Sequence, residues 1–265
     1  MATPQERPLL AFDTSTEILA VAACGPRGLS TWIGPGGSAA SAQLLPQIDA
    51  VLERAGLALA DLEAIAFGQG PGAFTGLRTS CAVAQGLGFG LARPLLPLDS
   101  LLIVAEDALE TPAARDDACV AAVAMDARMD EIYAGVYEHG AAGWRTLRRA
   151  ALYALADWNA VLEQEARSLH VLAGSALHAF GSRLHQPTGS IPRPDENDRA
   201  RALLRLARQA FAAGAAVDAA QALPLYLRDK VALTTAERAA VKAAAAPSAS
   251  TGAAVLRSGG SGGAT

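Results

Sequence analysis

Two stretches of the chain, more than a hundred residues apart, repeat the same order of residues. LLAFDTSTEILAVAA, at residues 9–23, runs from an apolar strand into a polar tip and back into an apolar strand. VAAVAMDARMDEIYAGVY, at residues 120–137, does the same, with Asp126 in the place of Asp13 and one residue inserted in the tip. Each copy is followed by a strand that ends in glycine and leads into a helix, AIAFG in the first and HVLAG in the second. Chance similarity of two β-hairpins is the alternative, but order and spacing favour a duplication with a period of about 113 residues, and hence two lobes of one fold.

Strands and helices alternate along the chain, and this alternation predicts an α/β fold with mixed sheets flanked by helices. The expected helices include 41–55, 75–92 and about 197–213. A length of 265 residues suits two domains of roughly 100 residues each. We place the first lobe at 1–110 and the second at 111–232, with a C-terminal end able to return to the first lobe. Residues 239–265 are rich in alanine, glycine and serine and are expected to be a disordered tail.

The segment AFGQGPGAFTGLRTS, at residues 66–80, is a glycine-rich loop between a strand and a helix. Loops of this kind often bind phosphate, but a P-loop closes with Lys-Ser/Thr, and no lysine lies near this loop. A dinucleotide fingerprint needs a third glycine where Ala73 stands. We therefore favour the interpretation that Gly70, Gly72 and Gly76 allow strand, loop and helix to pack closely.

Two lobes that each open with a hairpin tipped by Asp and Ser or Thr resemble the actin-like ATPase superfamily. The resemblance implies two actin-like (ribonuclease-H-like) lobes, the second of them degenerate. Five segments narrow it to the bacterial TsaB (YeaZ) family of tRNA threonylcarbamoyladenosine biosynthesis proteins, over roughly residues 8 to 232. They are LLAFDTSTEILAVAA, GQGPGAFTGLRTSCAVAQGL, LDSL, DARMDEIYAGVY and PLYLRDKVA.

The TsaB resemblance implies a noncatalytic subunit, with no cofactor of its own. Members of the family pair with TsaD, a paralogue that carries the metal and the active site, and they work with the ATPase TsaE. Together these proteins place a threonylcarbamoyl group on adenosine 37 of tRNAs reading ANN codons. ATP and metal are therefore expected in partner subunits, tRNA is expected to be contacted only indirectly, and a homodimer is expected as an alternative when the chain is alone.

The residues that could form a vestigial nucleotide site are Asp13, Thr14, Ser15, Gly70 and Gly72. In actin-like ATPases such a tip contacts phosphate and its Asp helps to hold magnesium, and a matching tip on the second lobe clamps the nucleotide. Here the matching tip is Ala127-Arg128-Met129, without glycine or hydroxyl, and AGSALHAF has one glycine where a pair is usual. A satisfied hairpin turn is favoured over a working site, and an independent actin-like ATPase or kinase remains the rival interpretation.

Other chemistries find little support in the sequence. No two of the four histidines stand three or four residues apart, so no helix face offers two imidazoles, and we expect neither a metal site nor a catalytic residue. A peptidase needs an activated nucleophile, but there is no G-x-S-x-G elbow, and Cys81 has no histidine near it in sequence.

A net charge of −4 argues against a nucleic-acid backbone as the main ligand. The N-terminus reads as neither signal peptide nor membrane span, and we expect a cytoplasmic protein that does not contact a membrane.

Two of the predicted helices carry the features of an interface. The helix at 75–92 is rich in glycine and alanine, and each glycine in a helix interior costs roughly 1 kcal/mol relative to alanine. Close approach of another backbone would offset that cost, either inside the chain or from a partner. With the TsaB resemblance, this helix and the one at 41–55 are expected to form the surface for TsaD or for a second copy. The candidate residues are Leu45, Ile48, Leu52, Thr75, Arg78, Thr79, Ala82 and Gly86.

Overall fold

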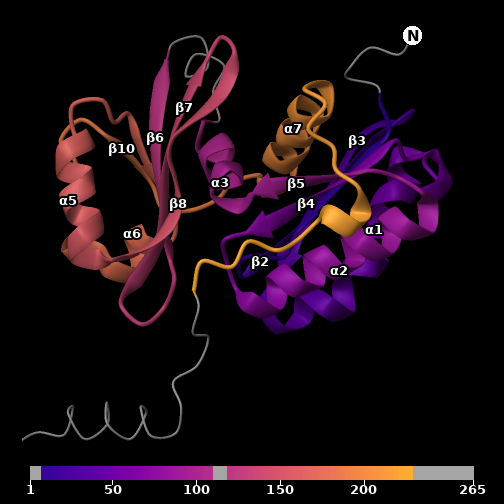
Figure 1. The fold of residues 1–265 in the computed structure, drawn as a ribbon, viewed down its shortest axis with the longest axis horizontal. Coiled ribbons are helices and arrows are strands. Elements are labelled where there is room, and N and C mark those ends of the chain that lie inside the picture. The colour runs from indigo at the N-terminus through magenta and orange to yellow at the C-terminus, as the bar shows by residue number, and fades with distance from the viewer. Residues whose placement is uncertain (1–6, 110–117, 229–265) are drawn as a thin grey trace, which may run out of the picture. The chain divides into compact units, whose positions relative to one another are not determined.

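The computed structural model describes residues 7–109 and 118–228, which contain two five-stranded mixed sheets (Figure 1). In the first sheet the order is β3-β2-β1-β4-β5. β1 and β2, and β2 and β3, pair antiparallel, whereas β4 pairs parallel with β1 and with β5. The strands are β1 (Leu9–Asp13), β2 (Ile18–Gly25), β3 (Gly28–Pro35), β4 (Ala64–Gly70) and β5 (Leu95–Asp99).

The second sheet repeats the topology of the first. Its order is β10-β9-β6-β7-β8, with an antiparallel meander from β6 to β8 and parallel pairing of β6 with β9 and of β9 with β10. The strands are β6 (Cys119–Asp126), β7 (Glu131–Gly140), β8 (Gly143–Ala154), β9 (Val171–Ala173) and β10 (Ile191–Arg193). The β6–β7 hairpin thus takes the place that the β1–β2 hairpin has in the first sheet. The predicted α/β fold of two similar lobes, each a mixed sheet flanked by helices, is confirmed.

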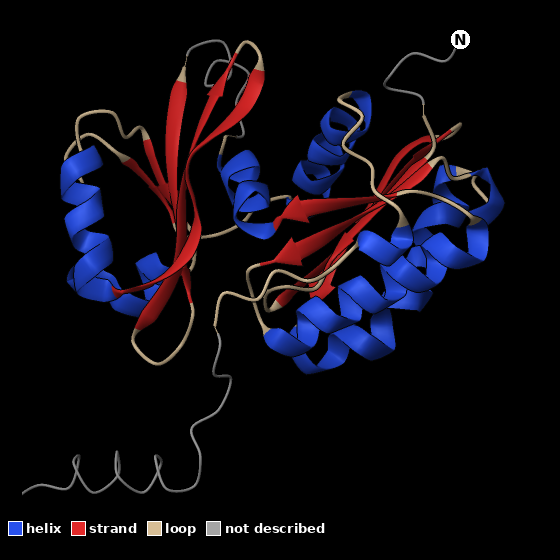
Figure 2. Cartoon of the chain, in the orientation of Figure 1, coloured by secondary structure: helices blue, strands red, loops and turns tan. Residues whose placement is uncertain are grey.

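Helices cover both faces of the first sheet (Figure 2). Alternate residues of a strand point to opposite faces, so Leu10 and Phe12 pack in the cluster that contains α1 and α2, while Leu9 and Ala11 pack in the cluster that contains α7. The bounds are α1 (Ala40–Ala55), α2 (Phe74–Leu91) and α7 (Arg199–Ala212), close to the predicted 41–55, 75–92 and 197–213. Although α7 follows the last strand of the second sheet in the sequence, it packs on β1 and β2 of the first.

The second sheet has α5 (Leu155–Glu165) and α6 (Ala176–Phe180) on one face, in a cluster centred on the buried Trp158. Its other face packs against α3 (Ser100–Ala108), which also contacts α7, so α3 joins the cores of the two sheets. The 3₁₀ turns are η1 (Gly37–Ala39), η2 (Leu59–Asp61), η3 (Gly181–Arg183) and η4 (Ala219–Gln221). No helix among the described residues combines the length and the apolar character that crossing a membrane requires. The predicted lobe boundary at 110–111 and the predicted tail at 239–265 lie outside the described residues.

Candidate functional site

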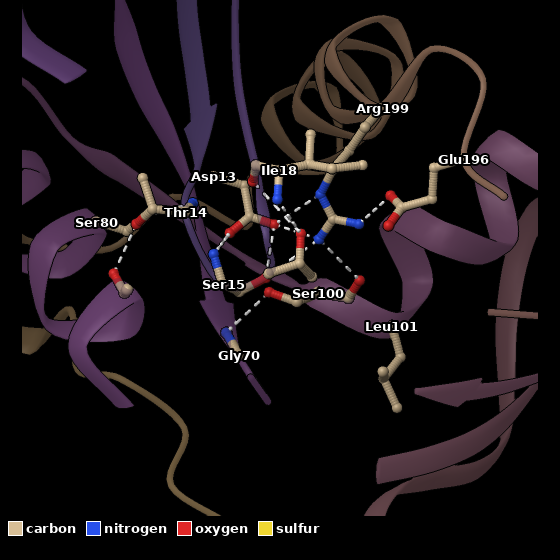
Figure 3. A network of polar contacts seen from close by, with 12 residues as sticks. Asp13, Thr14, Ser15, Ile18, Gly70, Ser80, Ser100, Leu101, Glu196 and Arg199 are labelled. Atoms are coloured by element: carbon tan, nitrogen blue, oxygen red, sulfur yellow. Dashed lines mark hydrogen bonds and ion pairs between the residues drawn. The ribbon is translucent and has the colours of Figure 1, made fainter. Parts of the chain in front are cut away.

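Asp13, Thr14 and Ser15, at the tip of the β1–β2 hairpin, are buried and hydrogen-bonded to other groups of the protein (Figure 3). The Asp13 carboxylate accepts hydrogen bonds from the Ser15 backbone N–H at 2.8 Å and from the Ser15 hydroxyl at 2.9 Å. Thr14 binds the start of α2: its hydroxyl donates to the Gly76 carbonyl at 2.6 Å and its N–H donates to the Ser80 hydroxyl at 3.1 Å. The turn is therefore satisfied and attached to α2, as the favoured interpretation of the sequence predicts.

The glycine-rich loop packs directly on this tip. A Cβ atom on Gly68 would lie 2.3 Å from the Asp13 carboxylate, and one on Gly72 would lie 2.3 Å from the Ser15 carbonyl oxygen. A Cβ on Gly76 would come within 1.9 Å of the Thr14 carbonyl oxygen. Gly70 has φ +117° and faces the Leu225 carbonyl, 2.7 Å from its Cβ position. The prediction that Gly70, Gly72 and Gly76 serve close packing is confirmed.

The residue that completes the tip is Arg199, the first residue of α7. Its Nε donates to Asp13 Oδ2 at 3.1 Å and its Nη2 donates to the same oxygen and to Ser15 Oγ, the latter at 3.2 Å. Its Nη1 donates to the Glu196 carboxylate, and Nη2 lies 3.5 Å from the Ser100 carbonyl oxygen. The Arg199 and Asp13 side chains are fully buried. Burial by itself lowers the pKa of the guanidinium, but the carboxylates of Glu196 and Asp13 outweigh it, so the pKa lies above its ordinary value and the charge is kept.

Sequence reasoning missed Arg199, which stands 186 positions after Asp13. One local signal was present. A cation in the first turn of a helix is opposed by the positive end of the helix dipole. An arginine at that position therefore needs a compensating anion, although the sequence does not say which one.

The second tip differs from the first in its backbone. Arg128, Met129 and Asp130 all have positive φ, between 58° and 63°, a conformation that costs a non-glycine residue roughly 1 kcal/mol. Two arginines hold this tip. The Arg228 Nη2 donates to the Ala127 carbonyl at 3.0 Å, and Arg183 pairs with Asp130. The large side chains that the sequence places at this tip, Arg128 and Met129, are both exposed.

The two tips meet at the surface, where Arg128 lies 3.4 Å from the Glu17 carboxylate and 3.2 Å from that of Asp126. Both Arg128 and Glu17 are exposed, so this pair is screened by water and contributes little to stability. The contact is nevertheless a direct one between corresponding hairpins of the two sheets.

The structure separates the predicted interface residues into two groups. Ile48 and Leu52 are buried in the core beneath α1 and are not part of the outer surface. This corrects their assignment to an outer face: α1 carries more apolar residues than one row can hold, and the sheet takes up Leu52 as well as Ile48. Leu45, Thr75, Arg78, Ala82 and Gly86 are exposed and Thr79 is half-buried.

Six arginines stand in two groups along the sequence, Arg145, Arg148 and Arg149 on β8 and Arg201, Arg205 and Arg208 on α7, and most of them have partners inside the protein. On α7, Arg201 pairs with Asp198, Arg205 with Glu106, and Arg208 Nη2 donates to Cys24 Sγ. On β8, Arg145 pairs with Glu138 and Arg148 with Glu165. These contacts tie the guanidinium groups to the fold.

Among the described residues, the groups that could serve hydrolysis do not assemble into a site. Cys81 is buried, its thiol donates to the Ala222 carbonyl at 3.4 Å, and burial raises its pKa, which is the opposite of an activated thiol. Over residues 7–109 and 118–228, no three His, Cys, Asp or Glu side chains lie together as metal ligands would.

Comparison with known proteins decides the family. The model of the family described as "TsaD: tRNA N6-adenosine threonylcarbamoyltransferase" matches residues 37–261. The tRNA threonylcarbamoyladenosine biosynthesis protein TsaB of Escherichia coli is 30% identical over 227 residues, which cover 84% of this chain and 96% of that protein. The chain belongs to the TsaB family. The resemblance that its motifs indicate is thereby confirmed.

Other relatives of the TsaB chain agree. The TsaB protein of Haemophilus influenzae is 42% identical over 130 residues, and this match spans 49% of the chain and about half, 53%, of that protein. The crystal structure of YeaZ from Pseudomonas aeruginosa has 35% identity and a TM-score of 0.70, and covers 83% of this chain and all of that one. A structure described as an uncharacterized protein with similarity to peptidase YeaZ, from the same organism, has 36% identity and a TM-score of 0.73, and covers 84% of this chain and all of that one.

Proposed function

We propose that this TsaB chain is a noncatalytic subunit that pairs with TsaD and supports the transfer of a threonylcarbamoyl group to adenosine 37 of tRNAs reading ANN codons. Its relatives carry names from this biosynthesis, and the family model that it matches is described as the threonylcarbamoyltransferase itself. ATP and metal then belong to the partner subunits TsaE and TsaD, and the chain contributes a surface and a fixed shape.

The observation that carries the noncatalytic role is the filled tip. The Asp13 carboxylate is used up by Ser15 and by the guanidinium of Arg199, and it has no exposed surface. Of the loop glycines that could otherwise surround a phosphate, Gly72 and Gly76 lie against the backbone of the tip, and Gly70 lies against the Leu225 carbonyl. A nucleotide at Asp13 would therefore have to displace both Arg199 and part of the hairpin.

The outward face of α2 supports a role for this helix in pairing. Ala82 and Gly86 are exposed one helical turn apart, and Cβ atoms on Gly86 and Gly90 would meet nothing within 4 Å. The cost of these helical glycines is thus not offset within the chain. Two large apolar side chains are also exposed, Leu45 on the neighbouring α1 at 51% and Phe89 on α2 at 62%. Small residues and exposed apolar side chains together suit a helix that packs against a partner's helices.

The internal pairing of the arginines supports only an indirect role toward tRNA. A protein that neutralises phosphates needs guanidinium or ammonium groups free to reach them. Here five of the six clustered arginines are already bound to acidic side chains or to a thiol. We therefore place the main tRNA contacts on the partner subunits.

A reconstituted modification assay tests the proposed function. TsaD, TsaE, the remaining pathway enzyme and tRNA would be combined with this chain, and each protein would be omitted in turn. We expect loss of threonylcarbamoyladenosine when this chain is absent, and no ATP turnover by this chain alone. ATP turnover or sugar phosphorylation by the isolated chain would favour the kinase interpretation, and full modification without the chain would contradict the proposal.

Ala82→Glu and Gly86→Glu are expected to abolish pairing with TsaD while leaving the fold intact. A charged side chain at either position would prevent close approach of a partner helix, but it points away from the sheet. Ala160→Glu is the matched control, because Ala160 is an exposed alanine on α5, which covers the second sheet. Pull-down with TsaD and a thermal melt would be measured for all three. Normal pairing by both α2 variants would show that the partner binds elsewhere.

A further inference from the structure

The Arg199 guanidinium lies in a cage of oxygen atoms contributed by three separate segments (Figure 3). Asp13 and Ser15 come from the β1–β2 tip, Ser100 from the start of α3, and Glu196 from the loop between β10 and α7. Two carboxylates, a hydroxyl and a carbonyl surround the positive charge. Oxygen ligands of these kinds are those that hard cations take in proteins.

Two carboxylates, those of Asp13 and Glu196, contact the single positive charge of Arg199. Asp107, also buried, accepts hydrogen bonds from the backbone N–H groups of Asn197 at 2.7 Å and Asp198 at 2.8 Å. Burial raises its pKa, opposed by those two hydrogen bonds. The Asp107 carboxylate therefore fixes the backbone of the loop that carries Glu196.

Neither helix formation nor core packing explains an arginine at this position. The first turn of α7 disfavours a cation, and burial of a charged group costs several kcal/mol unless it is paired. The neighbouring Arg201, on the same helix, shows the ordinary arrangement: it is exposed and pairs with Asp198 at 3.0 Å. Arg199, by contrast, is fully buried and pairs with the carboxylates of Asp13 and Glu196.

We infer that Arg199 is a tethered cation that plugs a cation-binding cage between the β1–β2 tip, α3 and α7. While α7 is docked on the first sheet, the cage is closed to free cations. The plug also holds the 194–198 loop, which leaves the second sheet, against the hairpin tip of the first. Arg199 would close the cage and hold this loop whether or not the chain serves tRNA modification.

Removal of the guanidinium from the full-length chain tests the inference. In Arg199→Ala the cage should accept a free cation in place of the lost side chain. The probes are Mn²⁺ and methylguanidinium at millimolar concentration, with methylurea as the neutral analogue. We expect at least one of the two cations to raise the Tm of Arg199→Ala by about 4 °C, and methylurea to have no such effect. The wild-type protein and Arg201→Ala should show no comparable rise.

A second variant ties the effect to the cage. Asp13→Ala/Arg199→Ala should lose the cation-dependent rise, because one of the two carboxylates that contact Arg199 is gone. Should Arg199→Ala fail to fold without additions, its yield of refolded protein would be measured with each probe, and a cation should restore it. The inference is overturned if neither cation changes the Tm or the refolding yield, if methylurea acts as well as the cations, or if the wild-type protein responds to the same extent.

Discussion

Replacing Asp13 with alanine is expected to lower the free energy of unfolding by about 3 to 5 kcal/mol, the usual cost of breaking a buried ion pair by removing one partner. Arg199 would remain fully buried with only Glu196 as a charged partner, and Ser15 would lose both of its hydrogen bonds to the Asp13 carboxylate. Urea denaturation of the wild-type and variant proteins measures the difference.

Two further variants distinguish the contribution of the Asp13–Arg199 ion pair from the destabilisation that any substitution can cause. Glu17→Ala breaks an exposed contact with Arg128 and should leave the denaturation midpoint nearly unchanged. Asp13→Ala/Arg199→Met removes both charges, so it should lose clearly less stability than the two single changes added together. An Asp13→Ala protein within about 1 kcal/mol of wild type, which is the range of ordinary substitutions, would contradict the proposed role of the pair.

Alanine is expected to have opposite effects at two glycines of the same helix. At Gly76, the new methyl group would overlap the Thr14 carbonyl oxygen at 1.9 Å, and the hairpin tip would have to move away from α2. Overpacking of this kind costs about 3 kcal/mol at the upper end of its usual range. At Gly86, a Cβ meets nothing within 4 Å, so alanine should stabilise the isolated chain by up to about 1 kcal/mol through its better helix propensity.

The same denaturation measurement, made on Gly76→Ala and Gly86→Ala, checks both signs. Both positions lie within α2, Gly76 in its first turn and Gly86 in its interior, and their surroundings differ. Equal changes in the free energy of unfolding for Gly76→Ala and Gly86→Ala would mean that the glycine-rich loop does not depend on contact with the hairpin tip.

The duplicated fold could be read from the sequence because it rests on local patterns. Successive side chains of a strand point to opposite faces. In LLAFD, Leu10 and Phe12 therefore share one face and Leu9 and Ala11 the other, and the structure packs the two pairs against different helices. The hairpin of the first repeat returns in the second, and the two sheets have the same strand order. The segments that indicated the TsaB family are likewise short and continuous.

The outer surface could be read only in part. The helical period groups Leu44, Ile48 and Val51 on one side of α1, and all three are buried, so the choice of Ile48 as an interface residue was wrong. It could not decide between burial and exposure for the neighbouring Leu45 and Leu52, because both stand at the edge of that row. In the structure Leu52 packs in the core cluster beneath α1, and Leu45 is 51% exposed.

What only the tertiary structure decided is the content of the site. The sequence by itself determined a polar hairpin tip, a glycine-rich loop without a phosphate-binding lysine, and glycines suited to close packing. It could not determine that α7, which follows the second sheet, packs on the first and brings Arg199 to Asp13. Charge pairing has no sequence period, and a buried arginine differs from an exposed one only in what the rest of the fold places around it. The oxygen atoms around Arg199 come from residues 13, 15, 100 and 196, so they meet only when both sheets and α3 are in place.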